Sequence, residues 1–200
     1  MSFVSRGFRG RREEDPRLPP GQYKEDGFPV LSAGPTPRID PAEYRFRIEG
    51  LVERPVEWSL DELKALPGST FTGDIHCVTK WSKLGTNFTG VLVDELLDAA
   101  SPLLDGGFAM AFSYGGYTTN LPLEDLTDGK AWVVWDHEDE PLEPEHGGPV
   151  RLLVPHLYFW KSAKWVQGLR LMDSDEPGFW EGLGYHMRGD PWREERYWGD

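Results

Sequence analysis

Glycine and proline interrupt this chain so often that neither a long helix nor a helical bundle fits it. The 200 residues include 23 Gly and 17 Pro, which indicates many turns and irregular connections. A chain of this length is enough for one domain with a substantial core, and its nine Trp and 38% hydrophobic residues argue against disorder of the whole. Short strand-like and helix-like segments alternate, so we expect a mixed α+β fold.

Local patterns predict the order of the elements. Apolar residues alternate at Tyr44, Phe46 and Ile48, which is typical of a half-buried strand. Ser59 and Glu62 form a capping-box pattern that predicts a short helix ending before Pro67. Further strands are expected over residues 71–78, 108–114, 117–121, 131–135, 150–155 and 165–171, a second helix over 91–100, and a packed C-terminal wrap over 178–200.

The first residues predict an arm rather than a domain. Residues 1–27 show no period and indicate a partly disordered arm, so residues 28–200 are expected to form a single domain. Arg11 and Arg12 look like the start of a twin-arginine export signal, but three acidic residues follow where an apolar stretch should be. We therefore expect no signal peptide and a cytoplasmic location.

Charge and hydropathy exclude two broad classes of partner. The net charge of −13 argues against a general nucleic-acid binder, whose surface is basic. No apolar run approaches the roughly 20 residues of a membrane helix, so we expect no membrane segment.

Cys77 is the only thiol in the chain, which excludes an intramolecular disulfide. An inert buried thiol, a nucleophile and a metal ligand all remain open, and the inert reading leads for a lone cysteine. His76 precedes it and Lys80 and Lys83 follow it. Cations favour the thiolate, which is the form that attacks or binds metal. These neighbours therefore add support for a nucleophile or a metal ligand.

The histidines leave two kinds of site to weigh. None of the five pairs at helical spacing with a second ligand, so a structural zinc site, which needs about four ligands, is not expected. A nucleophilic pair of Cys77 with His146 or His156 stays open.

Charge is distributed unevenly, and this predicts an anion site. Residues 91–145 hold thirteen Asp or Glu and one Lys, whereas residues 147–172 hold no acid. The cations of the second window and of the Cys77 segment are Lys80, Lys83, Arg151, Lys161, Lys164 and Arg170. Such a one-sign island indicates a bound anion, most commonly phosphate. For Arg151 alone, an ordinary salt bridge is an equally good reading.

Two segments have the backbone character of such a site. Gly147, Gly148 and Pro149 permit a tight turn just before Arg151. Ser162 and Ala163 lie between two lysines, where small side chains let backbone N–H groups approach an oxyanion.

The chain resembles the molybdopterin-dependent sulfite oxidase family, especially its small bacterial oxidoreductases. The resemblance covers most of residues 28–198 in the family's order. Its motifs are Phe28-Pro-Val-Leu-Ser-Ala-Gly-Pro-Thr-Pro37, Asp74-Ile-His-Cys-Val-Thr-Lys-Trp-Ser82, Gly116-Tyr-Thr-Thr-Asn-Leu-Pro122, His146-Gly-Gly-Pro-Val-Arg-Leu-Leu-Val-Pro155, Lys161-Ser-Ala-Lys-Trp-Val166, Glu176-Pro-Gly-Phe-Trp180 and Gly189-Asp-Pro-Trp192.

The resemblance implies a sulfite-oxidase-type molybdopterin-binding fold and an oxidoreductase that carries molybdenum and molybdopterin. It implies that Cys77 is the protein ligand of molybdenum, a soft thiolate for a thiophilic metal. The residues implied to contact the pterin or its phosphate are Ser32, His76, His146, Arg151, Ser162, Ala163 and Lys164.

The match to the family is not uniform, and the differences concern the substrate. Sulfite oxidases of the vertebrate type read Cys-Ala-Gly-Asn-Arg-Arg, and those arginines help to bind sulfite. This chain reads Cys77-Val-Thr-Lys-Trp-Ser82, which is more similar to the Cys-Val-Glu-Ala-Trp-Ser of bacterial methionine-sulfoxide reductase catalytic subunits. Lys80, Tyr114 and Tyr117 are our candidates for the substrate pocket.

We therefore expect oxygen-atom transfer to or from a small sulfite- or sulfoxide-like substrate, with single electrons exchanged with a separate partner. The leading alternative is a cofactor-free regulatory or interaction domain in which Cys77 is a redox-sensing thiol. A third reading is Cys-His hydrolysis.

Overall fold

The computed structural model describes residues 15–200. Residues 1–14, with the Arg11-Arg12 pair and half of the expected arm, lie outside the described residues. The rest of that arm includes a short strand, β1 (Tyr23–Lys24), which pairs in parallel with Trp81 and Ser82. This part of the arm is therefore hydrogen-bonded into a sheet.

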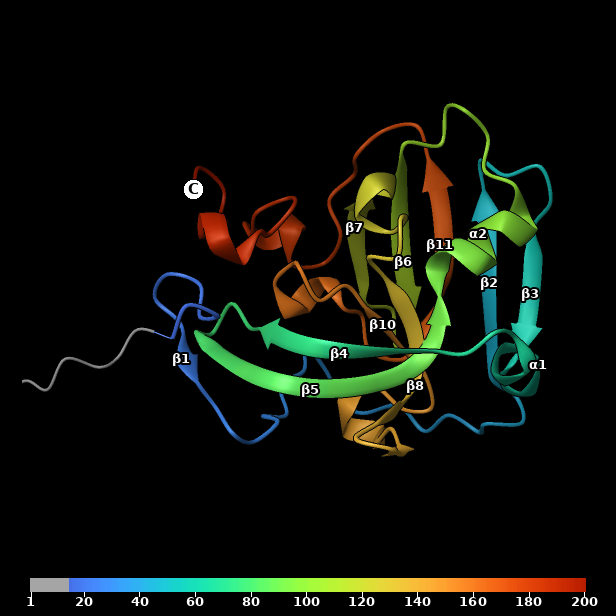
Figure 1. The fold of residues 1–200 in the computed structure, drawn as a ribbon. Helices are drawn as coiled ribbons and strands as arrows, with labels where there is room; N and C mark the ends of the chain where they lie inside the picture. Colours follow the sequence, from blue (N-terminus) through green and yellow to red (C-terminus); the bar gives the residue numbers. More distant parts are fainter. Residues whose placement is uncertain (1–14) are drawn as a thin grey trace, which may run out of the picture.

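Two sheets of mixed direction, with two short helices, make up the fold (Figure 1). The first sheet consists of β1, β4 (Ser69–His76), β5 (Trp81–Leu92), β8 (Trp132–His137), β9 (Glu140–Pro141) and β10 (Arg151–Leu153). The second has the order β3-β2-β11-β6-β7, with β2 (Arg45–Gly50), β3 (Val56–Ser59), β6 (Phe108–Ser113), β7 (Thr118–Pro122) and β11 (Val166–Met172). The helices are α1 (Leu60–Ala65) and α2 (Val93–Ala100). This is the α+β class that the sequence predicts.

Several predicted elements are confirmed with their physical cause. Tyr44, Phe46 and Ile48 are fully buried along and just before β2. The Ser59 side chain accepts the Glu62 N–H, and the Glu62 carboxylate accepts the Ser59 N–H, so α1 starts with the expected capping box. The predicted hairpin is β6–β7, which turns through Gly115 and Gly116, both at positive φ.

The longest strand, β5, was not predicted from the sequence. It runs from Trp81 to Leu92, so the predicted second helix begins at Val93 and not at residue 91. Gly85 and Gly90 and several polar residues hide its strand character. Gly90 is required because a Cβ there would overlap the carbonyl oxygen of Val133 on β8.

Apolar side chains form two buried clusters. The larger one lies among β2, β6, β11 and the two helices and includes Phe46, Leu96 and Leu169. The smaller one lies on the first sheet and contains Cys77 with Trp81 and other buried residues: Ile75, Phe88, Val134, Leu142, Leu153 and Phe159. The single thiol is thus part of a packed core beneath the first sheet.

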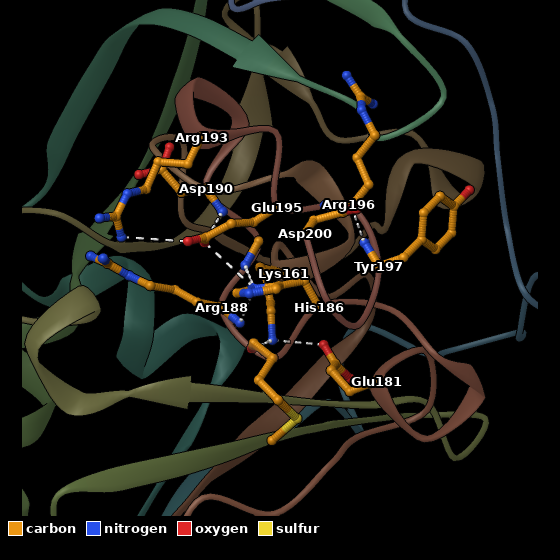
Figure 2. Close-up of polar contacts among 12 residues, drawn as sticks. Lys161, Glu181, His186, Arg188, Asp190, Arg193, Glu195, Arg196, Tyr197 and Asp200 are labelled. Atoms are coloured by element: carbon orange, nitrogen blue, oxygen red, sulfur yellow. Dashed lines mark hydrogen bonds and ion pairs between the residues drawn. The ribbon is translucent and has the colours of Figure 1, made fainter.

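The C-terminal wrap is held by buried polar contacts. Lys161 ends the 3-10 helix Phe159–Lys161, and its Nζ lies 2.6 Å from Oε1 of Glu181, with both side chains fully buried. Figure 2 shows this pair pointing at each other among other polar residues of the tail. Glu181 also accepts from Thr119 and Trp160. Within residues 15–200, no helix has the length and apolarity needed to cross a membrane.

Candidate functional site

A cavity of about 540 Å³ opens between the two sheets and the tail. Its walls come from segments far apart in the sequence: the loop 28–37, the turn after β4, the β6–β7 turn, the segment 159–165 and the tail. The predicted site residues that line it are Ser32, Cys77, Tyr114, Tyr117, His146, Arg151, Ser162, Ala163 and Lys164. Nine of the eleven predicted site residues therefore meet around one space.

The β4–β5 hairpin places Cys77 at this cavity. Cys77 directly follows β4, and its N–H donates to the carbonyl of Trp81 at 2.9 Å. The Lys80 N–H donates back to the Cys77 carbonyl at 3.0 Å, which closes a tight turn with Lys80 at φ +79°. The Gln22 side chain holds the same carbonyl at 3.1 Å. Three hydrogen bonds thus fix the backbone that carries the thiol.

Burial, and not the neighbouring cations, dominates the electrostatics of Cys77. Burial raises the pKa of its thiol, whereas a hydrogen bond from Thr79 Oγ1 to Sγ (3.1 Å) and the charge of Arg196 lower it. We expected His76, Lys80 and Lys83 to favour the thiolate, and this was wrong. The cation that acts on the thiol is Arg196 of the tail, which donates to the Val78 carbonyl at 2.6 Å.

Arg151 is a buried cation without a carboxylate. Its side chain donates to the carbonyls of His146 and Ser162, each at 2.7 Å, and stacks over Phe159 with 4.1 Å to the ring centroid. No acidic side chain of residues 15–200 pairs with it. Burial lowers its pKa to about 9. An ordinary salt bridge of Arg151 is therefore excluded within the described residues. The guanidinium can instead bind an anionic ligand.

Lys164 and His146 line the cavity together with Arg151. The Lys164 ammonium donates to the carbonyls of Leu31 (2.7 Å) and Glu145 (2.6 Å). Burial and the charge of Arg151 lower its pKa to about 8. Burial, Arg151 and Lys164 likewise lower the pKa of His146 to about 4, and its Nδ1 is buried without a partner among the described residues.

The backbone around these side chains is tightly arranged. Gly147 has φ +113°, and a Cβ there would lie 3.0 Å from Cβ of Arg151 and 3.1 Å from Cα of Lys164. Only glycine lets the two cationic segments approach this closely. Ser162 Oγ accepts the Val154 N–H at 2.9 Å, so this side chain braces the segment.

Three tyrosines line the same cavity. The Tyr117 hydroxyl donates to the Trp160 carbonyl at 2.6 Å, and burial raises its pKa well above 10. Tyr114 accepts the Arg45 N–H at 3.0 Å. Tyr185 was not among the predicted site residues. Burial, then Tyr197, then Cys77 raise its pKa, so its phenol lies within electrostatic reach of the thiol.

His76 and Lys80 are not among the residues that line the cavity. His76 is buried on the other side of the hairpin, with Nδ1 2.8 Å from Ser82 Oγ, and burial lowers its pKa to about 4. Lys80 lies on the surface at the turn.

The predicted one-sign island is only partly an anion site, which is a correction. Lys161 is neutralised by Glu181, Arg170 pairs with Glu49 at 2.9 Å, and Lys83 donates to the Asp26 carbonyl. Arg151 and Lys164 are the members that face the cavity.

A hydrolytic Cys-His pair is not formed. His146 stacks flat on Phe28, with 4.0 Å between centroids, and the described residues show no hydrogen bond between it and Cys77. His156 binds Asp125 at 3.0 Å and does not line the cavity. Within residues 15–200, no cluster of three or more His, Cys, Asp or Glu could hold a metal. Any metal here would thus depend on Cys77 together with ligands from a cofactor.

Comparison with known proteins gives the identity of this architecture. Residues 33–180 match the family model described as the oxidoreductase molybdopterin binding domain. The chain belongs to this family. It is 41% identical to the oxidoreductase YuiH of Bacillus subtilis over 94% of this chain and 96% of that protein. YedZ1 of Azospira oryzae, whose name describes a subunit of a protein-methionine-sulfoxide reductase, is 28% identical over 76% of this chain and 57% of its own length.

A solved structure agrees in fold. The sulfane dehydrogenase SoxCD of Paracoccus pantotrophus superposes with a TM-score of 0.64 at 24% identity, over 70% of this chain and 40% of that one. The expected sulfite-oxidase-type fold is confirmed. The protein is a molybdopterin-dependent oxidoreductase, as the resemblance implied.

The residues present fit that cofactor. A pterin phosphate is an anion, and the cavity holds two cations, Arg151 and Lys164, that lack carboxylate partners among the described residues. A soft metal needs a soft protein ligand, and Cys77 lines the same cavity.

Proposed function

We propose that this enzyme transfers an oxygen atom to or from a small, uncharged, sulfoxide-like substrate, with Cys77 as the protein ligand of molybdenum. When bound, the cofactor supplies the two-electron oxygen-transfer chemistry. The observation that carries the proposal is that one cavity contains the only thiol together with two cations lacking carboxylate partners.

Arg151 and Lys164 would bind the pterin phosphate, and His146 would contact the pterin beside them. His146 is a neutral imidazole near pH 7 because its pKa is about 4, so it contributes hydrogen bonds without a third positive charge. The Gly147 turn and Ser162 keep both cations in place.

The charge of the lining supports an uncharged substrate. Apart from Arg151 and Lys164, no Lys or Arg of the described residues lines the cavity. If the phosphate occupies those two, none remains to bind sulfite or nitrate, and burying an unpaired oxyanion is costly. Other described residues that line the cavity are neutral, among them Val78, Thr79, Trp180 and Tyr185. Tyr117 and Tyr185 would shape this pocket, and the name of the relative YedZ1 agrees with a sulfoxide.

A thiol-sensor function has less support. Sensor thiols are exposed and have a low pKa, whereas Cys77 is 7% exposed and burial raises its pKa.

Metal and pterin analysis tests the cofactor assignment. We expect Cys77→Ser to purify with molybdenum reduced to a small fraction of the wild-type content. Lys164→Gln should lose pterin, whereas the control Lys130→Gln, a surface lysine bonded to the Glu124 carbonyl, should retain it. Wild-type molybdenum content in Cys77→Ser would refute the ligand assignment.

Kinetic comparison of substrates tests the substrate class. With a reduced viologen dye as electron donor, kcat/KM for methionine sulfoxide should exceed that for nitrate, and the oxidised enzyme should turn over sulfite poorly. Preference for sulfite or nitrate would refute an uncharged substrate.

Residues 28–200 as one domain, a separate electron carrier and a cytoplasmic location are further parts of the proposal. The single cavity lined by residues of both sheets supports the first, and the presence of one cysteine in 200 residues supports the last. Limited proteolysis and cell fractionation test them.

A further inference from the structure

An exposed tryptophan lies directly against the residue that precedes Cys77. Trp192 is in the short 3-10 helix Pro191–Arg193 and is 51% exposed. Its ring meets His76 edge-on, with centroids 6.2 Å apart and an interplanar angle of 77°. The Asp190 carboxylate caps the Trp192 N–H at 2.8 Å, which fixes the start of this helix.

His76 and Cys77 face opposite sides of the hairpin. Successive side chains of a strand alternate in direction. Accordingly, Cys77 lines the cavity, whereas neither His76 nor Trp192 does. His76 is 4% exposed and is fixed by Ser82 Oγ at 2.8 Å. Covalent bonds from Cys77 to His76 and one aromatic contact thus lead to the surface without crossing the substrate cavity.

We propose that Trp192 is the point at which a one-electron carrier exchanges electrons with the metal site, and that His76 is the bridge. This rests on the proposed function, in which Cys77 holds the metal. Electron tunnelling decays steeply with distance, so covalent bonds and an edge-on ring contact favour this route over a gap through solvent. Reduction of a sulfoxide consumes two electrons and two protons and yields a thioether and water. Two molecules of the reduced carrier supply the electrons singly, and solvent supplies the protons.

The charge near Trp192 indicates the kind of carrier. The chain has a net charge of −13. Residues 190–200 carry four carboxylates, those of Asp190, Glu194, Glu195 and Asp200, against Arg193 and Arg196. Figure 2 labels Asp190, Glu195 and Asp200 together with both arginines. Arg196 is directed inward, to the Val78 carbonyl and the Tyr158 ring. Glu195 is 8% exposed and accepts from Arg193 and from the Asp190 N–H, so the exposed carboxylates of this segment are those of Glu194 and Asp200. These two carboxylates and the net charge of the chain favour a basic redox protein as the carrier.

Exchange of electrons at Trp192, which we call the port, also separates substrate binding from electron transfer at the metal site. Substrate enters the cavity on the Cys77 side, and the carrier binds on the Trp192 side. Both can be bound together, and electron delivery need not wait for release of the product.

Electron-exchange kinetics with cytochrome c, a basic haem protein, test the port. We expect Trp192→Ala to slow electron exchange with the reduced enzyme about 10-fold or more, equal to roughly 1.4 kcal/mol in the activation free energy. Trp192→Phe keeps a ring and should restore most of the rate. The matched control is Trp198→Ala, which removes another exposed tail tryptophan and should leave the rate unchanged. The wild-type rate should fall as salt is raised.

A binding measurement gives a readout that does not depend on turnover. In calorimetry, oxidised cytochrome c should bind the metal-free Trp192→Ala protein more weakly than the metal-free wild type. A wild-type exchange rate in a molybdenum-loaded Trp192→Ala enzyme would overturn the port alone, as would equal slowing by Trp198→Ala. Wild-type protein without molybdenum after expression with molybdate would overturn the proposed function and the port together.

Discussion

Two buried cations of this enzyme look alike in sequence and differ in what surrounds them. Arg151 has only carbonyl partners among the described residues, whereas Lys161 is paired with Glu181 at 2.6 Å. A buried charge that pairs with a residue of the chain has a structural role, whereas a buried charge that has no such partner can bind an ionic ligand. The difference decides which residue serves the cofactor.

Replacing each cation by methionine should separate the two roles. In cofactor-free protein, Lys161→Met should lower the free energy of unfolding by about 3–5 kcal/mol, because it leaves Glu181 buried and uncompensated. Arg151→Met should cost at most about 1–2 kcal/mol, since loss of an unpaired charge offsets the lost carbonyl contacts. Urea unfolding measures both.

Pterin retention should show the reverse order. Arg151→Met should lose the pterin, and Lys161→Met, where it still folds, should retain it. A larger stability loss in Arg151→Met than in Lys161→Met would contradict the assignment.

At the scale of elements, the site depends on the β4–β5 hairpin. β4 was predicted as a strand over residues 71–78 and is found over Ser69–His76. β5 was missed because its two glycines and many polar residues lower its strand propensity. Gly90 occurs there because β8 passes close to its backbone, and a neighbour 43 residues away is not visible in a local pattern.

A single methyl group should test this close approach. Gly90→Ala should destabilise the protein by about 1–3 kcal/mol, because the new Cβ overlaps the Val133 carbonyl. Gly107→Ala is the matched control, since a Cβ there meets nothing within 4 Å. It should be neutral or slightly stabilising. Thermal unfolding of both variants gives the comparison, and equal Tm values would argue against the crowding.

The difference between local sequence motifs and contacts with distant segments explains which site residues could be predicted. Cys77, His146, Arg151 and Lys164 lie in motifs whose residue types match the ligand chemistry, and each lines the cavity. Tyr185 could not be placed, because its position at the cavity depends on contacts of the tail with distant segments, such as that of Glu181 with Lys161. Lys80 was predicted at the substrate pocket, but a turn at positive φ leaves it on the surface.

At the scale of the whole molecule, Asp125 joins three segments that lie far apart in the chain. It ends the 3-10 helix Leu123–Asp125 and accepts hydrogen bonds from His156 at 3.0 Å and from both Nε and Nη2 of Arg188 at 3.0 and 2.9 Å. The side chain is 3% exposed. Burial alone would raise its pKa, but the hydrogen bonds from His156 and Arg188 outweigh it and lower the pKa from 3.8 to about 2.

This contact should make the closure of the tail sensitive to acid. Because the pKa of Asp125 is lower in the folded state than in the unfolded state, its contribution to stability is present above about pH 4 and is lost as the pH falls toward 2. The contribution is about 2 kcal/mol. Asp125→Asn should therefore lower the free energy of unfolding at pH 5 and flatten its pH dependence below pH 4. Asp128→Asn, at an exposed aspartate 82% accessible to solvent, should keep the wild-type profile. Urea unfolding between pH 5 and 2.5 measures both, and parallel profiles for Asp125→Asn and wild type would show that the tail is held without this carboxylate.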